Sequence, residues 1–150
     1  MARQVKFLTA PVLALTFLTA CAQSSAFEPL ADGPCTVNQE EAITKHLSAQ
    51  IDAFAARDWE LAYSYASGNF RQNVTLAEFT EIIQTQYDML IKNMGYSFGS
   101  CEISADNILR QVSVASAQSD FSLDYKLSFD NSKIGVESAV ITKISEGLSL

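Results

Sequence analysis

Residues Phe121–Phe129 read Phe-Ser-Leu-Asp-Tyr-Lys-Leu-Ser-Phe, and this stretch decides the class of fold. Apolar or aromatic side chains occupy every second position, with Ser, Asp or Lys between them. Successive side chains of a strand point to opposite faces of a sheet, so the alternation predicts a half-buried strand. Asp130-Asn131-Ser132-Lys133 follows as a turn. The next segment is therefore expected to pair with this strand in an antiparallel hairpin.

Three neighbouring segments extend the predicted sheet. Ile134–Ile144 is rich in β-branched residues, as strands are. Ile108–Ala117 places Val112 and Val114 on one face, and Tyr96–Ile103 is a weaker fourth strand. The second half of the chain thus predicts an antiparallel meander of about four strands.

The segment before the meander has a helical period instead. An apolar stripe predicts a first helix over Gln39–Ala56, capped at Asn38. Asp58 is expected to cap a short second helix that stops at Ser67-Gly68-Asn69. A capping box at Thr75 opens a third helix, which ends at Gly95. Three helices followed by a meander predict an α+β fold.

Length, charge and cysteine count limit the classes of function. A chain of 150 residues with 48% hydrophobic residues forms one globular domain. The formal net charge of −7 argues against an electrostatic nucleic-acid binder. The three cysteines are an odd number, so one of them needs a role other than an internal disulfide.

The first twenty residues have the pattern of an export signal. Arg3 and Lys6 precede an apolar run, Phe7–Leu18, that is too short to span a bilayer but fits a signal peptide. The run ends in Leu18-Thr19-Ala20-Cys21, which resembles the lipobox of bacterial lipoproteins. The resemblance implies cleavage before Cys21 and a diacylglyceryl group on its thiol. The alternative is an ordinary signal peptide cut near Ala20.

This resemblance divides the chain into a signal peptide (1–20), a lipidated tether (21–34) and a domain (35–150). Cleavage would remove two basic residues and leave 8 basic against 17 acidic, a net charge of −9. An acidic chain is not attracted to anionic lipid, so the acyl chains must provide the anchor. Ala22, rather than Asp, follows the cysteine, which implies the outer membrane if the cell has two.

With Cys21 lipidated, Cys35 and Cys101 remain as a pair. Exported domains lie in oxidising compartments where disulfides persist. We expect a Cys35–Cys101 disulfide, the alternative being two free buried thiols.

Residues 38–144 resemble the nuclear transport factor 2-like superfamily, and within it a bacterial family of unknown function. The resemblance implies a cone of helices against a curved sheet, which often dimerises through the open sheet face. The last strand departs from the pattern, since Ile134–Ser138 lacks the Trp and basic residue often found there. The residues that carry the resemblance are Ile43, Ile51, Phe54, Asp58, Ala62, Ala66, Phe70, Phe79, Tyr87, Gln111, Val112, Tyr125, Lys126 and Leu127.

Four residues form the candidate pocket of such a cone: Asp58, Trp59, Tyr87 and Tyr125. They suit a small, mostly apolar ligand, although the aromatic rings serve equally well as core packing. Enzymes of the superfamily place an Asp in the cone, and Asp58 is the best-placed candidate, but helix capping is its simpler role. His46 is the only histidine and lacks partners for catalysis or metal binding, so we expect no metal, cofactor or catalytic group.

The sequence therefore predicts a lipid-anchored protein of the cell envelope that faces the extracytoplasmic side. Its domain is expected to bind a small apolar ligand or an envelope protein, with a homodimer as a further expectation, and not to be an enzyme. Two alternatives stay open. One is a small isomerase- or dehydratase-like enzyme that uses a carboxylate inside the cone, and the other is a purely structural accessory domain.

Overall fold

The structure is a computed structural model that describes residues 30–130 and 132–146. The predicted signal peptide, Cys21 and most of the predicted tether lie outside the described residues. The last two tether residues, Gly33 and Pro34, form a short strand at the edge of the sheet.

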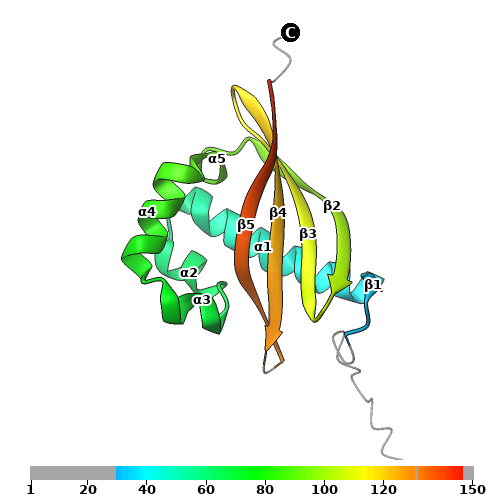
Figure 1. The fold of residues 1–150 in the computed structure, drawn as a ribbon. Coiled ribbons are helices and arrows are strands. Elements are labelled where there is room, and N and C mark those ends of the chain that lie inside the picture. Colours follow the sequence, from blue (N-terminus) through cyan, green and yellow to red (C-terminus); the bar gives the residue numbers. More distant parts are fainter. Residues whose placement is uncertain (1–29, 131, 147–150) are drawn as a thin grey trace, which may run out of the picture.

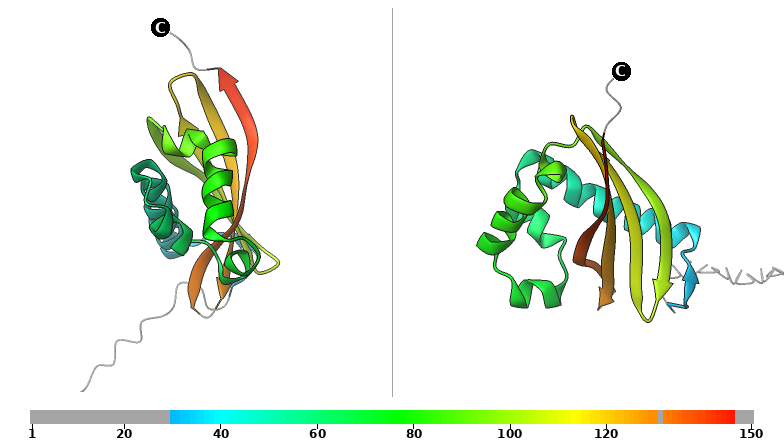
Figure 2. Two further views of the ribbon diagram at one scale, coloured as in Figure 1. Left: turned by 90° about the vertical axis from the view of Figure 1, so that its left-hand side faces the viewer. Right: turned by 45° about the horizontal axis from the view of Figure 1, so that its top comes forward.

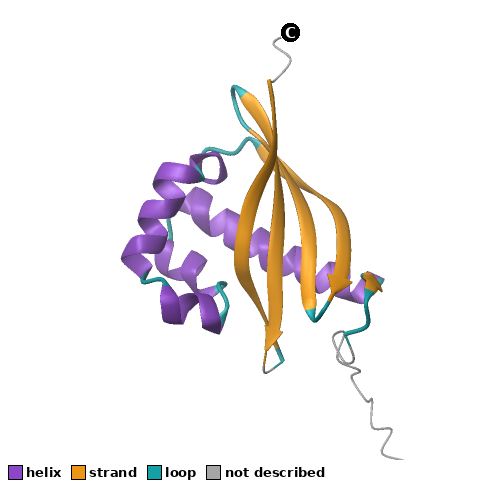
Figure 3. Cartoon of the chain, viewed as in Figure 1, coloured by secondary structure: helices purple, strands orange, loops and turns teal. Residues whose placement is uncertain are grey.

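The first half of the domain is helical and the second half is a sheet, which confirms the predicted α+β class (Figures 1 and 3). The helices are α1 (Val37–Ala56), α2 (Trp59–Ser64), α3 (Gly68–Asn73), α4 (Leu76–Gln86) and α5 (Asp88–Ile91). The strands are β1 (Gly33–Pro34), β2 (Gly95–Ser104), β3 (Asn107–Ala115), β4 (Ser119–Asp130) and β5 (Lys133–Glu146).

All five strands form one open antiparallel sheet in the order β1-β2-β3-β4-β5. Helix α1 crosses one face of this sheet, and the shorter helices lie beside the β5 edge (Figures 1 and 2). The other face carries exposed polar side chains such as Ser113, Asp124 and Lys126. The domain therefore has two layers, with its core between α1 and the sheet.

The predicted numbers of helices and strands were wrong. The third predicted helix is broken at Tyr87, whose backbone is not helical (φ −128°, ψ 33°) and whose hydroxyl donates to the Ala139 carbonyl of β5 at 2.6 Å. The predicted stop at Ser67 also opens α3, because the Ser67 hydroxyl accepts from the Phe70 amide at 2.9 Å. A fifth strand, β1, was not predicted. At both Tyr87 and β1, the chain contacts a segment that is distant in the sequence.

Helix α1 begins two residues earlier than its apolar stripe suggests. Thr36, not Asn38, is the cap: its side chain accepts from the Gln39 amide, and the Gln39 side chain accepts from the Thr36 amide at 2.8 Å. This reciprocal capping box satisfies two amides that the helix itself leaves free. The helix ends at Arg57, which adopts a left-handed conformation (φ 58°).

The core confirms the predicted apolar stripe and the predicted strand alternation. The α1 stripe is almost fully buried, as are the inward residues of β3 and β4: Ile43, Leu47, Ile51, Phe54, Ile108, Val112, Val114, Leu123, Tyr125 and Leu127. Burial of apolar area at roughly 25 cal/mol per Å² makes this contact the main stabilising term of the domain.

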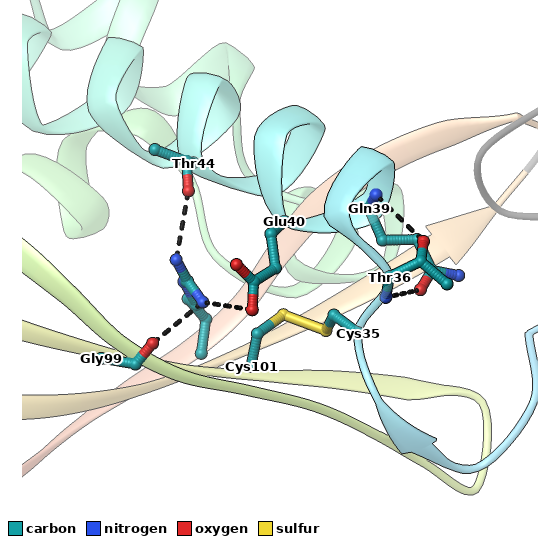
Figure 4. The surroundings of a disulfide bond; sticks show 8 residues. Cys35, Thr36, Gln39, Glu40, Thr44, Gly99 and Cys101 are labelled. Atoms are coloured by element: carbon teal, nitrogen blue, oxygen red, sulfur yellow. Dashed lines mark hydrogen bonds and ion pairs between the residues drawn. A yellow bond between two sulfur atoms is a disulfide. The ribbon is translucent and has the colours of Figure 1, made fainter.

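A disulfide joins Cys35, just before α1, to Cys101 in β2, as predicted (Figure 4). The two Cα atoms lie 5.4 Å apart. Beside it, the buried Arg110 guanidinium donates to the Gly99 carbonyl at 3.0 Å and lies 3.7 Å from the Glu40 carboxylate. Arg110 also stacks 5.3 Å from the Phe98 ring centre. The start of α1 is thus held to the sheet by a covalent bond and by a buried cation.

Gly135 lets α3 approach β5, and we predict that an alanine there destabilises the domain by about 1–3 kcal/mol. A Cβ at Gly135 would lie 2.5 Å from the Ser67 Cα, which is backbone and cannot rotate away. Urea denaturation of Gly135→Ala measures the effect. Gly68→Ala is the matched control, because a Cβ there meets nothing within 4 Å. Equal stability of the two variants would contradict the prediction.

Candidate functional site

A cavity of about 180 Å³ lies between the helices and the β5 side of the sheet, and it opens to solvent. Helices α1, α3, α4 and α5 and strands β4 and β5 all contribute to its wall. Most of the lining is apolar: Phe54, Ala66, Phe70, Phe79, Ile82, Ile83, Leu90, Val136 and Ala139. Its polar lining residues are Gln50, Tyr87, Tyr125, Glu137 and Ser138.

Two polar atoms of this lining have no hydrogen-bond partner among the described protein atoms. They are the Gln50 Oε1 and the Tyr125 hydroxyl, and both residues are only 2% exposed. The Gln50 amide nitrogen is used, since it donates to the Ala62 carbonyl at 3.2 Å. A buried polar group without a partner destabilises a protein by roughly 1–3 kcal/mol. These unpaired groups make the cavity the candidate functional site of the described residues.

The two tyrosines of the cavity differ in their hydrogen bonding. Tyr87 is held by its bond to the Ala139 carbonyl, whereas Tyr125 is fully enclosed and unpaired. Burial raises the pKa of the Tyr125 hydroxyl well above its ordinary value, and the nearby Tyr87 raises it further. Tyr125 is therefore a neutral group that can donate one hydrogen bond and accept another.

Glu137 is the one acidic or basic residue among the described residues that line this cavity. Burial raises its pKa, but hydrogen bonds from Ser67, Asn69 and Ser128 and the positive charge of Lys126 outweigh burial and lower the pKa below its ordinary value. The Asn69 amide donates to Glu137 Oε2 at 3.2 Å. The carboxylate is thus held in its charged form by its neighbours.

The structure brings together two of the four predicted pocket residues. Tyr87 and Tyr125 both line the cavity, and Asp58 and Trp59 do not. Asp58 is exposed and caps α2, where its Oδ1 accepts from the Leu61 amide at 3.1 Å. Trp59 is half-buried and packs against the edge of the core.

Gln50 and Glu137 line the cavity but were missed by the sequence analysis. A usable signal existed for Gln50, because it lies three residues after Leu47 and four before Phe54, inside the apolar stripe of α1. A polar residue at such a position is buried and needs a partner. No comparable signal exists for Glu137. The register of β4 against β5 shifts between Lys126 and Leu127, which lie opposite the Glu137 region, so regular alternation along β5 does not predict where Glu137 lies.

His46 lies outside the cavity, half-buried on α1. Its Nε2 donates to the Tyr65 carbonyl at 2.9 Å, and its ring meets the Tyr65 ring edge-on at 5.0 Å. Burial lowers the pKa of His46 below its ordinary 6.5, and the bond to Tyr65, which raises it, offsets only part of this.

We predict that His46 makes the domain less stable as the pH falls below about 6.5, the ordinary pKa of histidine. In that range the unfolded chain binds the proton more readily than the folded chain, so protonation favours unfolding. Urea midpoints of wild type and His46→Gln, measured between about pH 7.5 and pH 5.5, test this. Wild type should lose more stability than the variant, and parallel profiles would contradict the prediction.

Neither a metal site nor a membrane span is found within the described ranges. No three His, Cys, Asp or Glu side chains there lie close enough to hold a metal ion together. No helix between residues 30 and 146 is both long and apolar enough to cross a membrane.

Comparison with known proteins gives one match. A family model described as "Domain of unknown function (DUF4864)" covers residues 36–142, which include α1 and almost all of the sheet. No curated protein and no solved structure matches the chain. Since the family model covers more than half of the sequence, the chain belongs to the DUF4864 family of domains of unknown function.

Proposed function

We propose that this protein is a lipid-anchored binding protein of the cell envelope, whose domain holds a small and mostly apolar ligand. The observation that carries the proposal is the cavity between the helices and β5. It combines an apolar wall with two buried polar atoms, on Gln50 and Tyr125, that lack partners.

The size of the cavity limits the ligand. A dry cavity of about 150 Å³ lined by Leu, Ile and Phe binds benzene. The volume here is about 180 Å³. The ligand, or the part of it that enters, is therefore close in size to one substituted aromatic ring or a short branched chain.

The resemblance to the nuclear transport factor 2-like superfamily supports the same proposal. Helices on one face of an antiparallel sheet, with a cavity between them, are the arrangement that such a cone requires. Fold likeness alone does not carry a function, so the proposal rests on the cavity and its residues.

The cavity favours binding over catalysis. A carboxylate that acts as a base near neutral pH needs a raised pKa, whereas the pKa of Glu137 is lowered. Asp58 lies on the surface at the start of α2. Turnover of a bound ligand that depends on Glu137 would instead favour the isomerase- or dehydratase-like alternative.

Binding is tested with the full chain carrying Cys21→Ser, which removes the expected lipid and changes no described residue. We expect toluene to shift NMR signals of residues around the cavity. Ala139→Leu fills the space and should weaken toluene binding at least about tenfold, since a leucine side chain occupies most of a one-ring site. Val140→Leu, on the exposed side of the same strand, is the matched control. Toluene shifts that are absent, or unchanged in Ala139→Leu, would reject the proposal and favour a structural accessory domain.

The lipid anchor is tested separately, because it rests on the lipobox at Cys21 alone. Cells grown with labelled palmitate should incorporate the label into the wild-type chain and not into Cys21→Ser. Label in neither form would argue for an ordinary signal peptide or no export, and label in both forms would place the acylation at a residue other than Cys21.

A homodimer remains part of the proposal through the resemblance to the superfamily. The face expected to pair carries the polar Ser113, Asp124 and Lys126 and the exposed apolar Leu109 and Val140, so such a dimer would combine polar and apolar contacts. Sedimentation velocity of Cys21→Ser measures it, and Lys126→Glu should weaken any dimer through this face.

A further inference from the structure

We propose that the cavity selects a neutral molecule with an apolar body and a hydroxyl group, such as a phenol or a short alcohol, and rejects carboxylates. This inference deepens the ligand-binding function proposed above and rests on it. Two independent observations carry it: the charge of the lining and the hydrogen-bonding capacity of its unpaired atoms.

The charge of the lining excludes an anionic group. Glu137 is ionised, and no Lys, Arg or His belongs to the lining among the described residues. The positive charge of Lys126 already acts on Glu137. A ligand carboxylate would lose its hydration and meet no cation in the lining, which is strongly unfavourable.

A cationic group of a ligand would gain little binding energy beside Glu137. The Glu137 carboxylate already accepts hydrogen bonds from Ser67, Asn69 and Ser128. An ammonium group would have to displace these donors to pair with it, and it would lose its own hydration in an apolar cavity. A neutral ligand avoids both losses.

The unpaired atoms specify which neutral group fits. Gln50 Oε1 only accepts hydrogen bonds, and the Tyr125 hydroxyl can donate or accept. A ligand hydroxyl can donate to the first and accept from the second, whereas a pure hydrocarbon satisfies neither. Both residues line the cavity, but the two atoms have almost no exposed surface, so solvent does not satisfy them and a ligand hydroxyl reaches them only when the Gln50 and Tyr125 side chains turn toward it.

Three probes that share a methyl-substituted ring test the selection: p-cresol, toluene and 4-methylbenzoate. Binding of each to the full chain with Cys21→Ser is measured by NMR titration at neutral pH, where p-cresol is neutral and the benzoate is ionised. We expect p-cresol to bind at least about tenfold more tightly than toluene, which corresponds to one net hydrogen bond. We expect no detectable binding of the benzoate.

Two variants test whether the Tyr125 hydroxyl and the Gln50 Oε1 cause the preference for p-cresol over toluene. Tyr125→Phe and Gln50→Met should each bring the ratio of p-cresol to toluene affinity close to one, with toluene binding retained. Tyr125→Phe keeps the ring and removes an unpaired hydroxyl, so it should fold normally. Tyr96→Phe is the matched control, because it removes a hydroxyl that bonds to Asp52 and does not line the cavity.

The outcomes separate the two proposals. Toluene and p-cresol binding equally, or 4-methylbenzoate binding as tightly as p-cresol, would overturn the selection of a neutral hydroxyl and leave a ligand-binding cavity in place. An unchanged ratio in both Tyr125→Phe and Gln50→Met would also overturn it. Failure of all three probes to bind the cavity would overturn the proposed function as well.

Discussion

Replacing Cys35 and Cys101 with alanine is expected to lower the free energy of unfolding by about 4 kcal/mol. The disulfide closes a loop with a sequence separation of 66 residues, and most of its effect comes from restricting the unfolded chain. The folded state also depends on the bond locally. Strand β1 is only two residues long, so without the disulfide the pairing of β1 with β2 should fray first.

The measurement is urea denaturation of the double variant and of the Cys21→Ser chain, each with and without a reductant. Reduction should bring the parent chain to the stability of the double variant and leave that variant unchanged. A stability difference under 1 kcal/mol, or a double variant that still responds to reductant, would contradict the prediction.

Phe54→Ala is expected to destabilise the domain by about 3–5 kcal/mol, the usual range for a buried phenylalanine. Phe54 is 2% exposed, and its ring centre lies 5.7 Å from that of Phe79. It also lines the cavity. Its removal should therefore weaken the contact between α1 and α4 and enlarge the cavity by about the volume of the ring.

Two measurements check this prediction. Urea denaturation gives the loss of stability, and Leu109→Ala serves as the control because Leu109 is 42% exposed on the outer face of β3. The control should lose less than about 1 kcal/mol. Binding of naphthalene, which is larger than the single ring expected to fill the wild-type cavity, should be tighter in Phe54→Ala than in the wild type. A variant as stable as Leu109→Ala would show that Phe54 is not part of the core.

The regular parts of the fold could be read from local patterns. The α1 stripe and the alternation in Phe121–Phe129 both predicted their buried faces correctly, since each pattern spans several periods of its element. The Cys35–Cys101 pairing also followed from the sequence, once Cys21 was assigned to the lipid. The interpretation of Cys21 itself stays a prediction, because it lies outside the described residues.

The irregular parts could not be read in the same way. At the break, the Tyr87 hydroxyl bonds to the carbonyl of Ala139, 52 residues away in the chain. The pairing of Gly33–Pro34 depends on Ile103 and Glu102 of β2. Neither Tyr87 nor Gly33–Pro34 has a local conformational preference strong enough to predict its structure from the sequence.

For the site, the sequence by itself determined which residue types were available, and only the tertiary structure decided which of them meet. Tyr87 and Tyr125 were predicted to share a pocket and do so. Asp58 was assigned by resemblance to the same pocket, yet the start of α2 places it at the surface. Gln50 and Glu137 reach the cavity from α1 and β5.

The physical reason is the range of the interactions involved. Periodicity, capping and turn preferences act over a few residues, so the sequence shows them directly. A cavity forms where several elements fail to fill the space between them, and that depends on how α1, α4 and β5 pack together. The unpaired oxygens of Gln50 and Tyr125 become visible only once that packing is known.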